Sequence, residues 1–67
     1  MVMHFASFMN GQLVTMQVFD VCGRNLYEST FTVEGEVMNK DIYLVRGIYL
    51  VRFISGGYAT TLKIVKQ

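Results

Sequence analysis

The 67-residue sequence contains no proline and only one cysteine. A lone cysteine, Cys22, cannot form an internal disulfide bond, so the chain is not a disulfide-stapled small protein. Cys22 falls in a predicted turn, where two readings stay open: a tolerated turn residue, or an exposed thiol that reacts or links two copies. Charged residues make up only 16% of the chain, and the net charge is +1. Because the few basic residues are scattered, we expect no nucleic-acid partner.

Long apolar segments are also missing. No apolar run approaches the roughly 20 residues that a membrane-spanning helix needs. The N-terminus, which reads Met-Val-Met-His-Phe-Ala, has no basic leader followed by a long apolar stretch, so we predict no signal peptide in it. If this domain is exported, the signal peptide is expected on a longer protein of which this chain forms the end.

Residues for catalysis or metal binding are sparse. His4 is the only histidine, and no acidic residue or cysteine stands at a ligand or triad spacing from it. Glu34 and Glu36 fall in a predicted hairpin tip, where no apolar pocket would shift the pKa of either carboxyl. The dipeptide Gly56-Gly57 precedes a predicted strand rather than a helix, so it is not a phosphate-binding loop. We therefore expect no enzyme activity, no metal and no cofactor.

Apolar residues make up 52% of the chain, in runs rich in Val, Ile, Thr, Phe and Tyr. Turn residues separate these runs about every 8–12 residues, a spacing that predicts an all-β protein. We expect strands near residues 2–8, 13–20, 25–32, 36–38 with a continuation to 43, 48–54 and 58–66. The natural architecture is a single domain over residues 1–67, an antiparallel β-sandwich of two small sheets with about six strands.

The turns have local explanations. Asn10-Gly11 predicts a type I′ hairpin turn, which needs positive φ at both central residues. In the next turn, Asp20 fits the first position of a type I turn and Gly23 the fourth. Gly56-Gly57 fits a second two-residue hairpin. Gly47 is expected in a left-handed conformation, where a corner turns the chain into the fifth strand.

Both faces of the fifth strand are apolar. One face would carry Tyr49, Val51 and Phe53, and the other Ile48, Leu50 and Arg52. This pattern predicts a central strand that is covered on both sides. A chain of this length buries only about 60% of the surface its unfolded form exposes, so some apolar surface is expected to meet a partner or a second copy.

Three motifs, in this order, resemble one known family. Residues 19–24 read Phe-Asp-Val-Cys-Gly-Arg before a strand, residues 44–52 read Leu-Val-Arg-Gly-Ile-Tyr-Leu-Val-Arg, and residues 63–66 read Lys-Ile-Val-Lys. Over residues 16–66 the chain resembles the C-terminal sorting domain, or Por secretion tail, of proteins exported by the type IX secretion system of Bacteroidetes. The family usually opens with a Tyr-Pro-Asn-Pro segment. Because proline is absent here, residues 1–10 are expected to form an atypical or truncated first strand.

The resemblance implies an immunoglobulin-like sandwich that serves as a non-catalytic export signal. A secretion translocon would recognise it and a sortase-like component would usually cleave it, while the cargo travels through the periplasm to the outer-membrane surface or the medium. By this resemblance, the residues that the translocon recognises correspond to Lys63, Ile64, Val65 and Lys66. The turn residues of the family correspond to Asp20, Gly23, Arg24 and Gly47. If the first strands are missing, dimerisation or strand exchange at open strand edges would complete the sandwich.

One alternative stays open at this point. The chain could be an immunoglobulin- or fibronectin-like accessory domain of a secreted bacterial protein, with a structural or carbohydrate-binding role. A sugar platform would need some of the four tyrosines, Tyr27, Tyr43, Tyr49 and Tyr58, although cross-strand packing is their commoner role. Loss of residues 63–67 should abolish the function of a sorting signal, but should only weaken an accessory domain.

Overall fold

The chain forms strands joined by short turns in a computed structural model. The structure describes residues 2–39 and 42–67, apart from the side chains of Phe8 and Met38. The elements are β1 (Val2–His4), a 3-10 helix η1 (Ser7–Met9), β2 (Leu13–Asp20), β3 (Asn25–Thr32), β4 (Val37–Asn39), β5 (Gly47–Ser55) and β6 (Tyr58–Lys66). The predicted all-β class is confirmed. The bounds of β2, β3 and β6 are those expected from the sequence.

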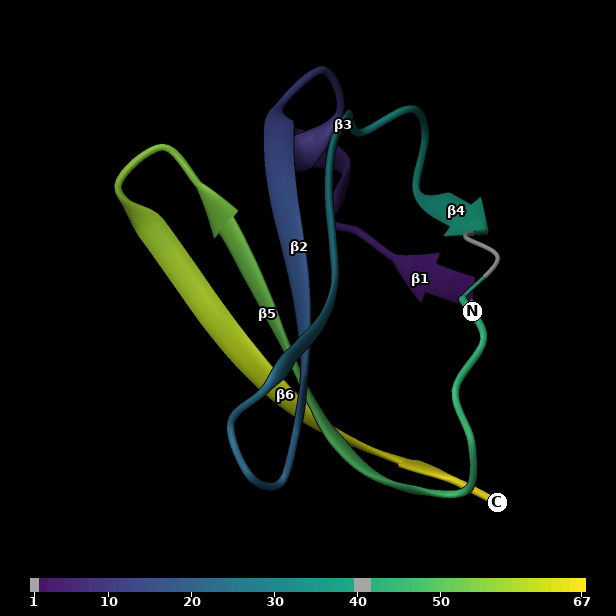
Figure 1. Ribbon diagram of the computed structural model, residues 1–67. Helices are drawn as coiled ribbons and strands as arrows, with labels where there is room; N and C mark the ends of the chain where they lie inside the picture. The colour runs from purple at the N-terminus through teal and green to yellow at the C-terminus, as the bar shows by residue number, and fades with distance from the viewer. Residues whose placement is uncertain (1, 40–41) are drawn as a thin grey trace.

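Four of the strands form an antiparallel sheet in the order β3-β2-β5-β6, while β1 and β4 pair separately (Figure 1). In Figure 1 the β1–β4 pair lies at the right, and the β5–β6 turn lies at the far left. The small pair therefore leaves the part of the sheet near this turn uncovered. Closure into an immunoglobulin-like sandwich stays a prediction.

The core lies between the four-stranded sheet and β1. Met16 and Val18 of β2, Tyr49 and Val51 of β5 and Met3 of β1 form one buried cluster. Along each strand these side chains alternate with less buried ones, because successive residues of a strand point to opposite faces. We call the face of the sheet that carries this cluster the inner face. Phe5 extends the cluster with edge-to-face contacts to Phe31 and Phe53, at centroid distances of 6.2 and 5.9 Å.

The first expected strand is too long, and the Asn10-Gly11 prediction of a type I′ hairpin is wrong. β1 ends at His4 and η1 follows it. Asn10 has φ −57° and ψ 128°, Gly11 has φ 85°, and the Gln12 N–H donates to the Met9 carbonyl at 2.9 Å. These angles are those of a type II turn. The reason is tertiary: β1 pairs with β4 rather than with β2, so this turn leads from one sheet to the other.

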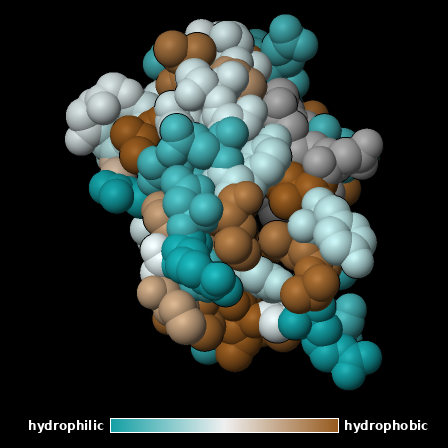
Figure 2. All heavy atoms as spheres, in the orientation of Figure 1, coloured by the Kyte–Doolittle hydropathy of each residue, from teal (hydrophilic) through white to brown (hydrophobic). Residues whose placement is uncertain are grey.

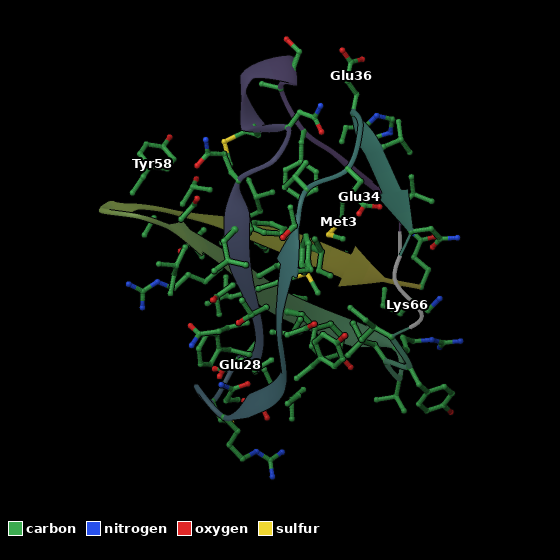
Figure 3. All side chains as sticks on the ribbon, turned by 90° about the horizontal axis from the view of Figure 1, so that it is seen from above. Met3, Glu28, Glu34, Glu36, Tyr58 and Lys66 are labelled. Atoms are coloured by element: carbon green, nitrogen blue, oxygen red, sulfur yellow. The ribbon has the colours of Figure 1, made fainter. Side chains whose placement is uncertain are left out.

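The connection between β3 and β4 also differs from its prediction. Glu34 and Glu36 do not form a hairpin tip, since β3 and β4 belong to different sheets. Both side chains are exposed (Figure 3). The Phe5 N–H donates to the Glu36 carbonyl at 2.7 Å. Ile42 and Tyr43 lie outside any strand, and residues 40–41 of the expected continuation lie outside the described residues.

Gly47 has a positive φ of 159°, a range that L side chains rarely adopt, but it lies far from the compact left-handed conformation that the sequence predicts. It is the first residue of β5 and pairs with Lys66. The preceding corner is held instead by the Tyr49 hydroxyl, which donates to the Val45 carbonyl. A Cβ atom on Gly47 would lie 3.5 Å from the Tyr49 hydroxyl oxygen, an ordinary contact.

Candidate recognition surface

The β5–β6 hairpin carries most of the residues that the sequence singles out. Its two strands pair over their whole length, from Ser55↔Tyr58 at the turn to Gly47↔Lys66 at the other end. Gly56 has φ 59°, whereas Gly57 has no positive φ, a combination that fits a type II′ turn. Within the described residues β6 pairs only with β5, so its other edge is open.

The four predicted tail residues point to different sides of the sheet. Ile64 lies opposite Tyr49 and packs against the buried cluster on the inner face. Lys63 and Val65 project from the opposite, outer face, because residues two apart in a strand share a face. Lys66 lies at the end of β6, far from Tyr58 at its start (Figure 3). The strand therefore does not present the four side chains as one group.

On the outer face, Lys63 and Val65 stand beside side chains of β5. Leu50 is the register partner of Lys63, and Ile48 is that of Val65. We call these four residues the outer-face patch. Its three apolar members are 44% (Ile48), 39% (Leu50) and 62% (Val65) exposed. The prediction that β5 is covered on both sides is wrong, since the described residues cover only its inner face.

A shallow hollow adjoins the patch where β5 begins and β6 ends, lined by Arg46, Gly47, Ile48, Val65, Lys66 and Gln67. Figure 2 shows hydrophobic side chains at the lower end of the molecule, where Figure 1 places the β2–β3 turn and the start of β5. Apolar surface and terminal strand residues therefore meet at this end. The sequence did not single out Ile48 and Leu50; the signal was the second apolar face of β5.

The cations around the patch lack acidic partners. In the described part of the chain the one ion pair joins Arg24 to Asp20, with Nε and Oδ2 2.8 Å apart. Arg46, Arg52 and Lys63 make none with a described carboxylate. The patch is therefore apolar with uncompensated positive charge at its margin.

The predicted turn residues Asp20, Gly23 and Arg24 do come together. The Asp20 carboxylate accepts the backbone N–H of Cys22 at 2.9 Å and of Arg24 at 3.0 Å, besides the Arg24 guanidinium. These hydrogen bonds, foremost that of the Arg24 backbone, hold the pKa of the Asp20 carboxyl below its usual value. The Gly23 N–H closes the turn on the Asp20 carbonyl at 3.0 Å, with Gly23 at φ 87°.

This turn lies at the same end of the sheet as the tail. Asp20 is the register partner of Tyr49, and Tyr49 is that of Ile64. The β2–β3 turn and the end of β6 are thus joined by one row of paired strands. The turn supplies no free charge at this end of the sheet, because Arg24 is engaged with Asp20.

The described residues contain no group of three or more His, Cys, Asp or Glu side chains that could hold a metal ion. Cys22 is exposed and unpaired, and His4 is exposed on β1. No helix in the described ranges is long and apolar enough to span a bilayer. What remains is a flat, partly apolar surface next to an open strand edge.

Comparison with known proteins identifies the family of the chain that carries this surface. A family model described as the secretion system C-terminal sorting domain matches residues 3–67. The chain belongs to this family. The match confirms the resemblance and extends it to residues 3–15, which the three motifs did not cover. Searches of curated proteins and of solved structures found no significant match.

The sorting domain is a C-terminal signal for type IX secretion, and a protein that carries it is exported. Its family is non-catalytic. The match favours this function over the accessory-domain alternative, for which neither the fold nor the comparisons offer separate support.

Proposed function

We propose that this sorting domain acts over residues 1–67 as a non-catalytic recognition element that the type IX translocon of a Bacteroidetes bacterium reads. The observation that carries the proposal is the hairpin of β5 and β6, whose last strand has an open edge and ends in a basic, apolar segment. An open edge can accept a strand of a partner, and uncompensated lysines add a charge signal. No bound cofactor is needed for such a role.

The geometry divides the work among the four tail residues. Lys63 and Val65 would touch the translocon, because both side chains are exposed on the outer face. Ile64 would act indirectly by anchoring β6 to the buried cluster. Lys66 would add charge at the strand end.

The cargo would first cross the periplasm with the domain attached. After recognition, a sortase-like component would remove the domain, and the cargo would reach the outer-membrane surface or the medium. In transit, a second copy that pairs at an open strand edge would complete an immunoglobulin-like sandwich. The supporting observations are the open edge of β6 and the apolar side chains of Leu62 (53% exposed) and Tyr58 (69% exposed) on the inner face.

The test is export of a reporter. The full chain is fused to the C-terminus of a folded reporter with a Sec signal, and the extracellular reporter is measured in a type IX-competent strain and in one without the translocon. We expect export in the first strain only. A double substitution, Lys63→Ser with Val65→Ser, should lower export about tenfold, as for loss of an interface anchor.

The matched control is Thr61→Ser with Ala59→Ser, on the same strand and the same outer face. It should leave export unchanged. Retention of the unmodified fusion in the periplasm of both strains would contradict the proposed function. Removal of residues 63–67 is a weaker test, since it also takes Ile64 out of the core.

A further inference from the structure

The outer-face patch crosses two strands, and half of it lies outside the terminal tail. Ile48 and Leu50 come from β5, while Lys63 and Val65 come from β6. Each β5 residue is the register partner of a β6 residue, and directly opposed side chains on one face lie within contact reach. A partner that touches Lys63 and Val65 from outside must therefore also meet Ile48 and Leu50.

The basic side chains Arg52 and Lys63 on this face are not ion-paired within the described residues. Glu28 is in the same cross-strand row as Arg52, with Gln17 between them. Its Oε1 instead accepts the side-chain amides of Gln17 at 2.8 Å and Asn25 at 3.3 Å. Asp20 is held by Arg24. Within the described residues neither Arg52 nor Lys63 forms an ion pair, so each can pair with a carboxylate of a partner.

The layout of the patch is that of a protein interface. Apolar side chains occupy the middle, and the cations Arg46, Arg52, Lys63 and Lys66 stand around them, as in an interface with an apolar core and a polar rim. Surfaces that lie on membranes usually add tryptophan or tyrosine anchors. The patch has neither residue type, which favours a protein over a lipid surface.

We propose that the recognition surface of this sorting domain is a composite of β5 and β6, centred on Leu50 and Ile48. Its occupant is a folded protein surface that presents an apolar side chain flanked by carboxylates. This inference rests on the proposed function, because the protein in question belongs to the export machinery. Ile48 and Leu50 are thereby specificity-determining residues beyond the tail.

The experiment uses the same reporter fusion with the full chain. Leu50→Ser removes an apolar side chain from the patch. The control Leu13→Ser removes the same side chain from the same face at the far end of the sheet. We expect Leu50→Ser to lower export about tenfold and Leu13→Ser to stay within about twofold of the unmodified fusion.

A second pair tests the charge. Lys63→Glu should lower export, because it would face the partner's carboxylates, whereas Ala59→Glu on the same face near the hairpin turn should not. Since Leu50 is partly covered, Ile48→Thr serves as a milder patch variant that keeps a β-branched residue in the strand. Circular dichroism and thermal melting of each purified chain verify that it is folded.

The outcomes separate the two proposals. If the unmodified fusion is not exported, the proposed function itself fails. If it is exported but Leu50→Ser and Ile48→Thr match Leu13→Ser, the composite surface is overturned and the function stands. The last experiment is flotation of the purified chain with phosphatidylglycerol vesicles, and we expect no binding. Binding that Leu50→Ser abolishes would contradict the proposal that the patch binds a protein.

Discussion

At the residue scale, the turns show which local signals survive in the folded chain. Asp20 and Gly23 occupy the ends of a β-turn because the Asp20 side chain satisfies two nearby backbone N–H groups. That interaction needs nothing beyond the turn itself, so the sequence alone is enough to predict it. Asn10-Gly11 carries an equally strong hairpin signal, yet Asn10 keeps a negative φ because its flanking segments pair with other strands.

Gly23→Ala should destabilise the domain by about 1 kcal/mol, the cost of a left-handed conformation for a residue with a Cβ atom. The cost should be purely conformational, because nothing lies within 4 Å of the Cβ position and φ is 87°. Urea unfolding measures it.

Gly57→Ala is the matched control for this prediction. Gly57 also has open space around its Cβ position but has no positive φ. The substitution should be neutral or should stabilise the domain by up to about 1 kcal/mol, because it lowers the conformational entropy of the unfolded chain. Equal losses for the two variants would show that the left-handed conformation is not the cause.

At the element scale, strand bounds followed from the sequence wherever turn residues frame an apolar run. β2, β3 and β6 begin and end as expected, whereas β1 and β4 are short and pair with each other. A three-residue strand is too short for its sequence pattern to indicate which distant segment it pairs with. The same limit applies to the candidate site: the tail was located from its motif, but its division between two faces depends on the partner strand.

The two apolar faces of β5 illustrate the point. Alternation correctly places Val51 on one face and Leu50 on the other, but it cannot say which face is covered. Coverage depends on where the β1–β4 pair lies. The pattern therefore reveals the second apolar face of β5 but predicts, wrongly, that this face is covered.

Burial within β2 gives a direct test of the inner face. Met16→Ala removes a side chain with 0% exposure and should destabilise the domain by about 2–5 kcal/mol, through lost transfer energy and a cavity. Leu13→Ala, in the same strand but 62% exposed, should cost about 0.5 kcal/mol or less. Urea denaturation measures both, and equal midpoints would contradict the assigned core.

At the scale of the whole molecule, the fold is unevenly covered. The β1–β4 pair shields part of the inner face, and a groove of about 380 Å³ remains between it and the hairpin. Met3, Phe5 and Val51 line the groove on the covered side, and Leu62 and Ile64 line it on the side of β6. Apolar area left in water costs about 25 cal/mol per Å², so burial of this groove favours association.

We therefore predict that the purified sorting domain self-associates at tens of micromolar, a range typical of weak protein contacts. In a two-fold pair joined at β6, each residue near the axis faces its own copy. Leu62→Lys would then oppose two like charges and remove apolar area, so sedimentation velocity should show a shift to monomer. Leu13→Lys adds the same charge at a distant exposed site and should leave the dimer intact.

A strictly monomeric unmodified chain at these concentrations would contradict the prediction. The outer-face patch would be unaffected by that result, because it lies on the other side of the sheet from Leu62. A dimer that joins through β6 would in turn occupy the open edge that the translocon is proposed to read. Export should then require dissociation of the dimer. A dimer of the fusion that is cross-linked across β6 should be retained in the periplasm, whereas the fusion without the cross-link should be exported.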